Sequence, residues 1–189
     1  MKLSILIPTL ESRAYQLAYL LNTLNLQILE ANAFDKVEIK MVSDNGEASI
    51  GAKRNELLRM ANGEYVCFVD DDDMVENHYI KTILNGLEAK PDCLSLRGVI
   101  TWDSTNPEIF EHSIKYDAYR TNNTGEVKYE RYPNHLNVIR SEIAKNFKFP
   151  EINHGEDTDW ATQIYKSGVL KNEFYIDKTL YHYQYKPNK

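Results

Sequence analysis

The stretch Tyr65-Val66-Cys67-Phe68-Val69, followed at once by Asp70-Asp71-Asp72-Asp73, decides how this 189-residue chain folds. An uninterrupted apolar run of this length is typical of a strand that is buried on both faces of a parallel sheet. Adjacent carboxylates raise one another's pKa unless a cation neutralises them, so the run is unfavourable without a ligand. A solvated acidic loop is the alternative, but such loops seldom follow a buried strand directly. Because hard oxygen donors suit Mg²⁺ and Mn²⁺, we expect a metal-binding loop at the end of this strand.

Predicted strands and helices alternate around this run through the first hundred residues. Apolar residues recur at helical spacing between Leu17 and Ile28, and Pro8, Gly46 and Gly63 mark segment ends. The predicted strands are 3–7, 37–42, 65–69 and 93–100, and the predicted helices are 17–28, 52–61 and 77–87. This order predicts an α/β fold, with a mostly parallel, Rossmann-type sheet and helices on both faces.

The second half of the chain is richer in tyrosine and less regular. We expect strands near 126–132 and 180–185, a helix after Ser141, and a helix over 156–166 that stops at Gly168. These elements predict a small α+β half that belongs to the same single domain, 1–189, with a division near residue 100.

Composition and charge exclude several classes of protein. The net charge of −6 argues against a general nucleic-acid-binding protein, which needs a basic face. No apolar stretch reaches the roughly 20 residues of a transmembrane helix, and the apolar run 3–7 is too short for a signal peptide. Cys67 and Cys93 are too few for a disulfide scaffold. We therefore expect a soluble, cytoplasmic protein.

Polar segments follow three of the predicted strands: Pro8-Thr9, Ser43-Asp44-Asn45 and the aspartate run. Ligands of such sheets bind beyond the carboxyl ends of the strands, so these segments predict a site. The sequence has no glycine-rich phosphate loop, which leaves the phosphates of a nucleotide to metal and side chains. Lys53 and Arg54 open a helix nearby and could reach an anion, although an ordinary basic first turn explains them equally well.

Two further signals lie in the second half. Glu156-Asp157 begins a helix, where capping and the helix dipole favour carboxylates regardless of function. The same position suits a general base. His135 and His182 could line the site, and His182 could complete a metal shell, although a structural role is the commoner one for each.

Taken together and in order, these motifs resemble those of family 2 glycosyltransferases with the GT-A fold. The matching segments are 4–9, 42–45, 51–55, 61–66, 68–73 and 155–157 with Trp160. Glu11 stands where the family commonly has Asn. The four aspartates fit either Asp70-x-Asp72, which we favour because Phe68-Val69 fixes the strand end, or Asp71-x-Asp73.

The resemblance implies an inverting enzyme that moves a sugar from a nucleotide-diphosphate sugar, a UDP-sugar by the motifs, to a hydroxyl of a glycan, a lipid-linked molecule or a protein. Residues 1–100 would bind the nucleotide and 101–189 the acceptor. The donor contacts would be Pro8, Thr9, Asp44, Arg54, Asp70 and Asp71. Asp72, with His182, would hold Mn²⁺ or Mg²⁺, and Asp157 would take the acceptor's proton.

Three other functions would use a similar acidic rim. A metal-dependent nucleotidyltransferase would consume a nucleoside triphosphate and release pyrophosphate. A phosphatase with an aspartyl nucleophile would form a phosphoenzyme and ignore UDP-sugars. A non-catalytic nucleotide-sugar module would bind the donor without turnover.

Overall fold

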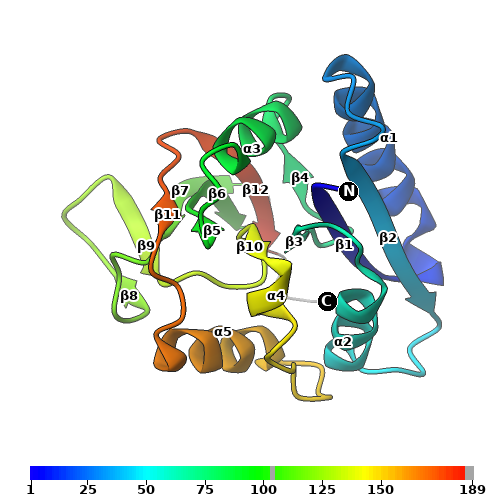
Figure 1. The fold of residues 1–189 in the computed structure, drawn as a ribbon. Coiled ribbons are helices and arrows are strands. Elements are labelled where there is room, and N and C mark those ends of the chain that lie inside the picture. Colours follow the sequence, from blue (N-terminus) through cyan, green and yellow to red (C-terminus); the bar gives the residue numbers. More distant parts are fainter. Residues whose placement is uncertain (103–104, 186–189) are drawn as a thin grey trace.

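Two mixed sheets form the centre of the molecule, with helices packed against them (Figure 1). The computed structural model describes residues 1–102 and 105–185. The first sheet has the strand order β11-β5-β10-β3-β1-β2. Its strands are β1 (Leu3–Leu10), β2 (Val37–Asp44), β3 (Tyr65–Phe68), β5 (Cys93–Leu94), β10 (Ile139–Arg140) and β11 (Glu173–Phe174). β1 pairs in parallel with both β2 and β3, as the sequence predicts.

The second sheet stands beside the first and has the order β4-β12-β6-β7-β9-β8. Its strands are β4 (Met74–Val75), β6 (Leu96–Trp102), β7 (Thr105–His112), β8 (Arg120–Thr121), β9 (Val127–Arg131) and β12 (Thr179–Tyr185). Each sheet therefore takes strands from both sides of residue 100.

Helices cover both faces of the first sheet because β1 alternates its side chains between two cores. Leu3, Ile5 and Ile7 join one core with α1 and α3, whereas Leu6 joins the other with α2, α4 and α5. The helices are α1 (Ala14–Glu30), which follows the 3-10 turn Glu11–Arg13, then α2 (Ile50–Met60), α3 (Tyr79–Leu87), α4 (Ser141–Ala144) and α5 (Glu156–Ser167). The predicted α/β class is confirmed. No helix of the described residues is long and apolar enough to cross a bilayer.

The segment 93–100, predicted as one strand, serves both sheets. Cys93 and Leu94 belong to the first, and the chain enters the second at Leu96. Ser95 lies between the two strands, where the chain passes from the first sheet to the second. Its backbone N–H donates to Phe174 O at 3.1 Å, and its Oγ accepts the Ile176 N–H at 2.7 Å. An apolar run does not reveal such a transition, since both parts are buried.

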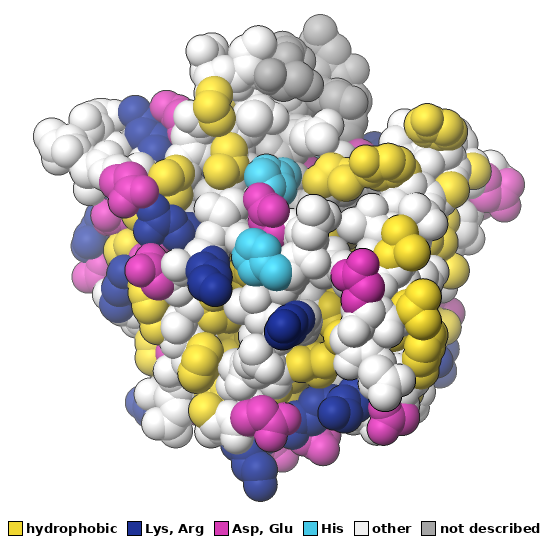
Figure 2. Space-filling model, turned by 90° about the horizontal axis from the view of Figure 1, so that it is seen from above, with side chains coloured by type: hydrophobic (Ala, Val, Ile, Leu, Met, Phe, Trp, Pro, Cys, Tyr) yellow, Lys and Arg dark blue, Asp and Glu magenta, His cyan; other side chains and the backbone are white. Residues whose placement is uncertain are grey.

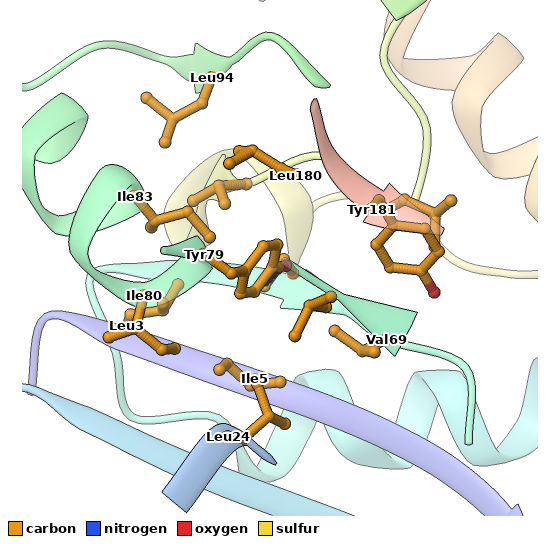
Figure 3. Packing of buried hydrophobic residues seen from close by; sticks show 14 of the residues in the cluster. Leu3, Ile5, Leu24, Val69, Tyr79, Ile80, Ile83, Leu94, Leu180 and Tyr181 are labelled. Atoms are coloured by element: carbon orange, nitrogen blue, oxygen red, sulfur yellow. Dashed lines mark hydrogen bonds between the residues drawn. The ribbon is translucent and has the colours of Figure 1, made fainter. Parts of the chain in front are cut away.

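The second sheet meets the first through the larger core. Figure 3 shows Tyr181 of β12 as part of this cluster, which also includes Val69, the residue that follows β3. The Tyr181 ring is packed with the apolar side chains, while its hydroxyl points away from them (Figure 3). This hydroxyl reaches the aspartate run, so the core fixes where the run lies.

Candidate active site

The four aspartates alternate between buried and accessible positions. The side chains of Asp70 and Asp72 are 25% and 16% exposed, whereas Asp71 and Asp73 are buried. The run turns back on itself, because the Asp73 N–H donates to Asp70 O at 3.1 Å. The accessible pair is the predicted Asp70-x-Asp72 register.

The buried pair is held by neighbours from distant parts of the chain. Asp71 accepts hydrogen bonds from Thr9 Oγ1 at 2.6 Å and Arg13 Nη1 at 2.8 Å. Asp73 accepts the Tyr181 hydroxyl at 2.9 Å and the Gln184 N–H at 2.9 Å. Burial, and then the charge of Asp70, raises the pKa of Asp73 well above its usual range. Asp73 therefore anchors the loop.

Asp70 lies in a cationic environment. Arg54 donates from Nη2 to Asp70 Oδ1 at 3.0 Å, and its Nη1 pairs with the buried Glu156. Burial would raise the pKa of Asp70, but Arg54 and His135 outweigh it, so the pKa falls below its usual range. Arg54 thus joins the end of β3 to the start of α5. The sequence alone allows either a nucleotide contact or an ordinary helix residue at this position.

Asp157 faces the same site from the first turn of α5. Gly155 precedes the helix with a φ of +83°, a conformation that favours glycine, and turns the chain into it. Asp157 Oδ1 accepts the Thr158 N–H at 2.7 Å, while Oδ2 lies 3.6 Å from His135 Nδ1. His135 Nε2 lies 3.6 Å from Asp70 Oδ2, so the imidazole stands between the two carboxylates.

A cavity of about 460 Å³ opens onto these side chains. Arg54, Asp70 and Asp157 line it, so the structure brings together three residues that are far apart in sequence. Its opposite wall comes largely from the second sheet and the loop before β8, and includes Ile100, Phe110, His112, Tyr119, Tyr129, Arg131 and Tyr183. Our sequence analysis did not identify Arg131 or Tyr119, since nothing in their local pattern marks them.

Unpaired polar atoms concentrate at this cavity. Five buried side-chain atoms of the described residues lack a hydrogen bond of normal geometry, and four of them belong to Arg54, Tyr119 and His135. Buried polar groups are nearly always paired, with protein or with ordered water, so these atoms leave room for polar ligand atoms or water at the cavity.

The remaining predicted contacts lie beside the cavity rather than in it. Asp44, at the end of β2, pairs with Lys53 and accepts the N–H groups of Gly46 and Ala48. Lys53 holds the pKa of Asp44 below its usual value. Pro8 and Thr9 are buried at the end of β1. These residues form a second polar area next to the aspartate loop.

His182 lies on β12, opposite Met74 of β4. Its Nε2 is 2.7 Å from Glu76 Oε1. In the part of the chain that the structure describes, no three or more His, Cys, Asp or Glu side chains are grouped closely enough to bind a metal by themselves. The place of His182 in a metal shell stays a prediction.

Comparisons with known proteins bear on the family, through a family model, and on the fold, through solved structures. The family model described as "Glycosyl transferase family 2" matches residues 26–147. No curated protein matches the chain.

Solved structures of S. aureus TarS 1-349 are similar in fold. The complex with UDP-GlcNAc has a TM-score of 0.68 and 20% identity, over 100% of this chain and 60% of that one. The complex with UDP has a TM-score of 0.67 and 20% identity, over 99% and 61%. The chain spans about 60% of the length of these structures. With the family model covering most of the chain, the protein belongs to glycosyl transferase family 2 and has its GT-A-like fold.

Proposed function

We propose that this protein transfers a sugar from a UDP-sugar to a hydroxyl acceptor, with inversion at the anomeric carbon and with a divalent metal at the diphosphate. The observation that carries the proposal is one cavity lined by both Asp70 and Asp157, with the His135 imidazole between them at 3.6 Å from each carboxylate. Family membership and the UDP and UDP-GlcNAc complexes of TarS support the choice of donor.

The carboxylate oxygens of the aspartate loop suit a divalent cation that binds together with the diphosphate of the sugar donor. Asp70 and Asp72 supply hard oxygen atoms at the accessible side of the loop. Mg²⁺ typically takes one or two protein carboxylates and completes its shell with phosphate oxygens and water. Asp72 would hold the Mn²⁺ or Mg²⁺, with His182 as a further candidate ligand. When bound, such an ion stabilises the negative charge of the departing diphosphate.

The nucleotide would lie along the carboxyl ends of β1 and β2. Asp44 would accept the uracil N3–H, and Pro8 and Thr9 would form the edge of the uridine site. Arg54 and Asp70 would contact the donor beside the cavity. Asp71, which fixes Thr9 and Arg13, would shape the near edge of the ribose and sugar sites.

Asp157 would act as the general base. Its Oδ1 is held by the Thr158 N–H, which leaves Oδ2 directed toward His135 and the cavity. A hydroxyl between Asp157 and the sugar would attack from the side opposite the diphosphate, and Oδ2 would take its proton. Attack from that side inverts the anomeric centre. His135 would keep the two carboxylates in position.

Titration calorimetry with UDP, with and without Mn²⁺, tests the donor site, and GDP and CMP are the control ligands. We expect UDP, but not GDP or CMP, to bind in the presence of Mn²⁺. We also expect the protein to release UDP from a UDP-sugar when an acceptor is present. NMR of the product would give the anomeric configuration. Pyrophosphate release from a nucleoside triphosphate would support a nucleotidyltransferase, and UDP-sugar binding without transfer or hydrolysis would support a binding module.

A further inference from the structure

Arg131 differs from the other arginines of the chain. Arginine occurs at seven positions, all of them described. Six of these side chains lie within 4.0 Å of a carboxylate, and they are Arg13, Arg54, Arg59, Arg97, Arg120 and Arg140. Acidic and basic side chains are likewise interspersed on the face shown in Figure 2. Arg131 has no such partner among the described residues, although it lines the cavity.

Two tyrosine rings hold the Arg131 side chain instead. Its guanidinium carbon lies 4.5 Å from the centre of the Tyr119 ring and 5.6 Å from that of Tyr129. Such cation–π contacts orient a guanidinium but leave its net charge in place. His112 stands opposite Arg131 in the register of β7 and β9. Burial, and then the charge of Arg131, lowers the pKa of His112 to about 3, so the neighbouring wall is neutral.

Arg131 and Asp157 line one cavity and act on the same neighbour. Burial, and then the charge of Asp157, raises the pKa of Tyr119, and Arg131 opposes this. The two charges therefore both lie within electrostatic range of that ring. The Tyr119 hydroxyl is one of the unpaired buried atoms of the cavity.

We propose that Arg131 binds an anionic group, a phosphate or a carboxylate, on the acceptor whose hydroxyl is placed at Asp157. This inference rests on the proposed function. Arg131 belongs to β9 of the second sheet, whereas the expected donor contacts belong to the first sheet, its strand ends and α2. A guanidinium fork matches either anion with two parallel hydrogen bonds.

The test compares three probes of similar size: glucose, glucuronate and glucose 6-phosphate. Each is titrated by ligand-observed NMR at saturating UDP and Mg²⁺, so that the donor diphosphate site is filled. We expect both anions to bind about tenfold more tightly than glucose, as one charge-assisted contact allows. Arg131→Gln should abolish this preference. Arg120→Gln, on the adjacent strand with a side chain 55% exposed, should keep it. Whichever of glucuronate and glucose 6-phosphate binds more tightly indicates whether the acceptor carries a carboxylate or a phosphate.

Equal binding of the three probes to the wild type, or the same preference in Arg131→Gln, would overturn the inference. So would a loss of UDP affinity in a cooperatively melting Arg131→Gln, which would assign the residue to the donor. Failure of the wild type to bind UDP would overturn the proposed function instead. In that case the same titrations without UDP would decide: tighter binding of the anionic probes than of glucose would support the anion site, and equal binding would overturn it.

Discussion

The two walls of the cavity treat their charges in opposite ways. On the wall of the first sheet the cations are matched: Arg54 pairs with Asp70 and Glu156, and Lys53 pairs with Asp44 beside it. On the wall of the second sheet Arg131 rests on aromatic rings without a carboxylate among the described residues. The cations of the first wall are already paired in the folded protein, whereas Arg131 keeps a charge that a ligand can pair with. In the function proposed above, the first wall positions the reacting groups and the second selects the acceptor.

Asp157→Asn should have the largest effect of the substitutions considered, and its effect should be on the rate of transfer. Removing the base should lower the rate of transfer by about 10²- to 10⁴-fold. UDP affinity should change little, because in the proposed mechanism Asp157 faces the acceptor rather than the donor. Transfer rates and calorimetry on the same variant measure the two quantities. Asp159→Asn, an equal change in charge at an exposed position of the same helix turn, is the control. An equal loss of UDP affinity in Asp157→Asn would place this carboxylate with the donor.

Arg54→Gln tests the matched wall. The variant leaves the buried Glu156 without its partner, and breaking a buried pair costs about 3–5 kcal/mol of unfolding free energy. Chemical denaturation measures the loss. Arg59→Gln is the control in the same helix, since its side chain is 76% exposed and should cost less than about 1 kcal/mol. Similar stabilities of the two variants would show that the first wall does not depend on its ion pairs.

Asp72→Asn tests which aspartates of the run face the donor. We expect Mn²⁺-dependent UDP affinity to fall by about a hundredfold, which is about 2.7 kcal/mol. Asp73→Asn should leave that affinity nearly unchanged, because the asparagine oxygen can still accept the Gln184 N–H and its amide can donate to the Tyr181 hydroxyl at this buried position. Calorimetry with and without Mn²⁺ measures both variants, after melting curves establish that they fold. The reverse result would favour the Asp71-x-Asp73 register.

His112→Gln probes the second wall and should have the smallest effect. The folded-state pKa of His112 is about 3, below the ordinary value of 6.5. The unfolded chain therefore takes up a proton between these pH values while the folded protein does not, so stability falls as the pH is lowered. The contribution is at most about 1.4 kcal/mol per pH unit. The variant should unfold with a shallower pH dependence, measured by denaturation between pH 4 and 7. His154→Gln, at an exposed position, should keep the wild-type slope.

The first wall could be predicted from sequence because its residues follow contiguous patterns. Apolar residues and turn signals locate β1, β2 and β3, although β1 and β2 extend to Leu10 and Asp44, beyond the predicted ends at 7 and 42, and parallel pairing then brings their ends together. The start of α5 is marked by Gly155 and an acidic pair. These local signals do not themselves bring Asp157 to Asp70; that meeting is expected from the resemblance to family 2 glycosyltransferases, and both residues do line one cavity.

The second wall could not be predicted, because its properties depend on pairings between distant residues. β7 begins with Thr105, Asn106 and Pro107, and asparagine and proline are typical of turns, so the sequence pattern does not predict a strand here. The burial of Asp73 is set by Tyr181 and Gln184, more than a hundred residues later. Whether Arg131 finds a carboxylate can be known only when every neighbour has been placed.

The anchoring of Asp73 by β12 has a consequence for biosynthesis. The aspartate loop leaves the ribosome more than a hundred residues before Tyr181 and Gln184, so its buried carboxylate waits for partners that are translated much later. β10 must likewise enter between β3 and β5 before the first sheet is continuous. Pairings this distant in sequence form slowly and leave apolar surface exposed meanwhile. The nascent chain should thus acquire an ordered aspartate loop only after β12 has docked, which makes that docking the step that completes the proposed site.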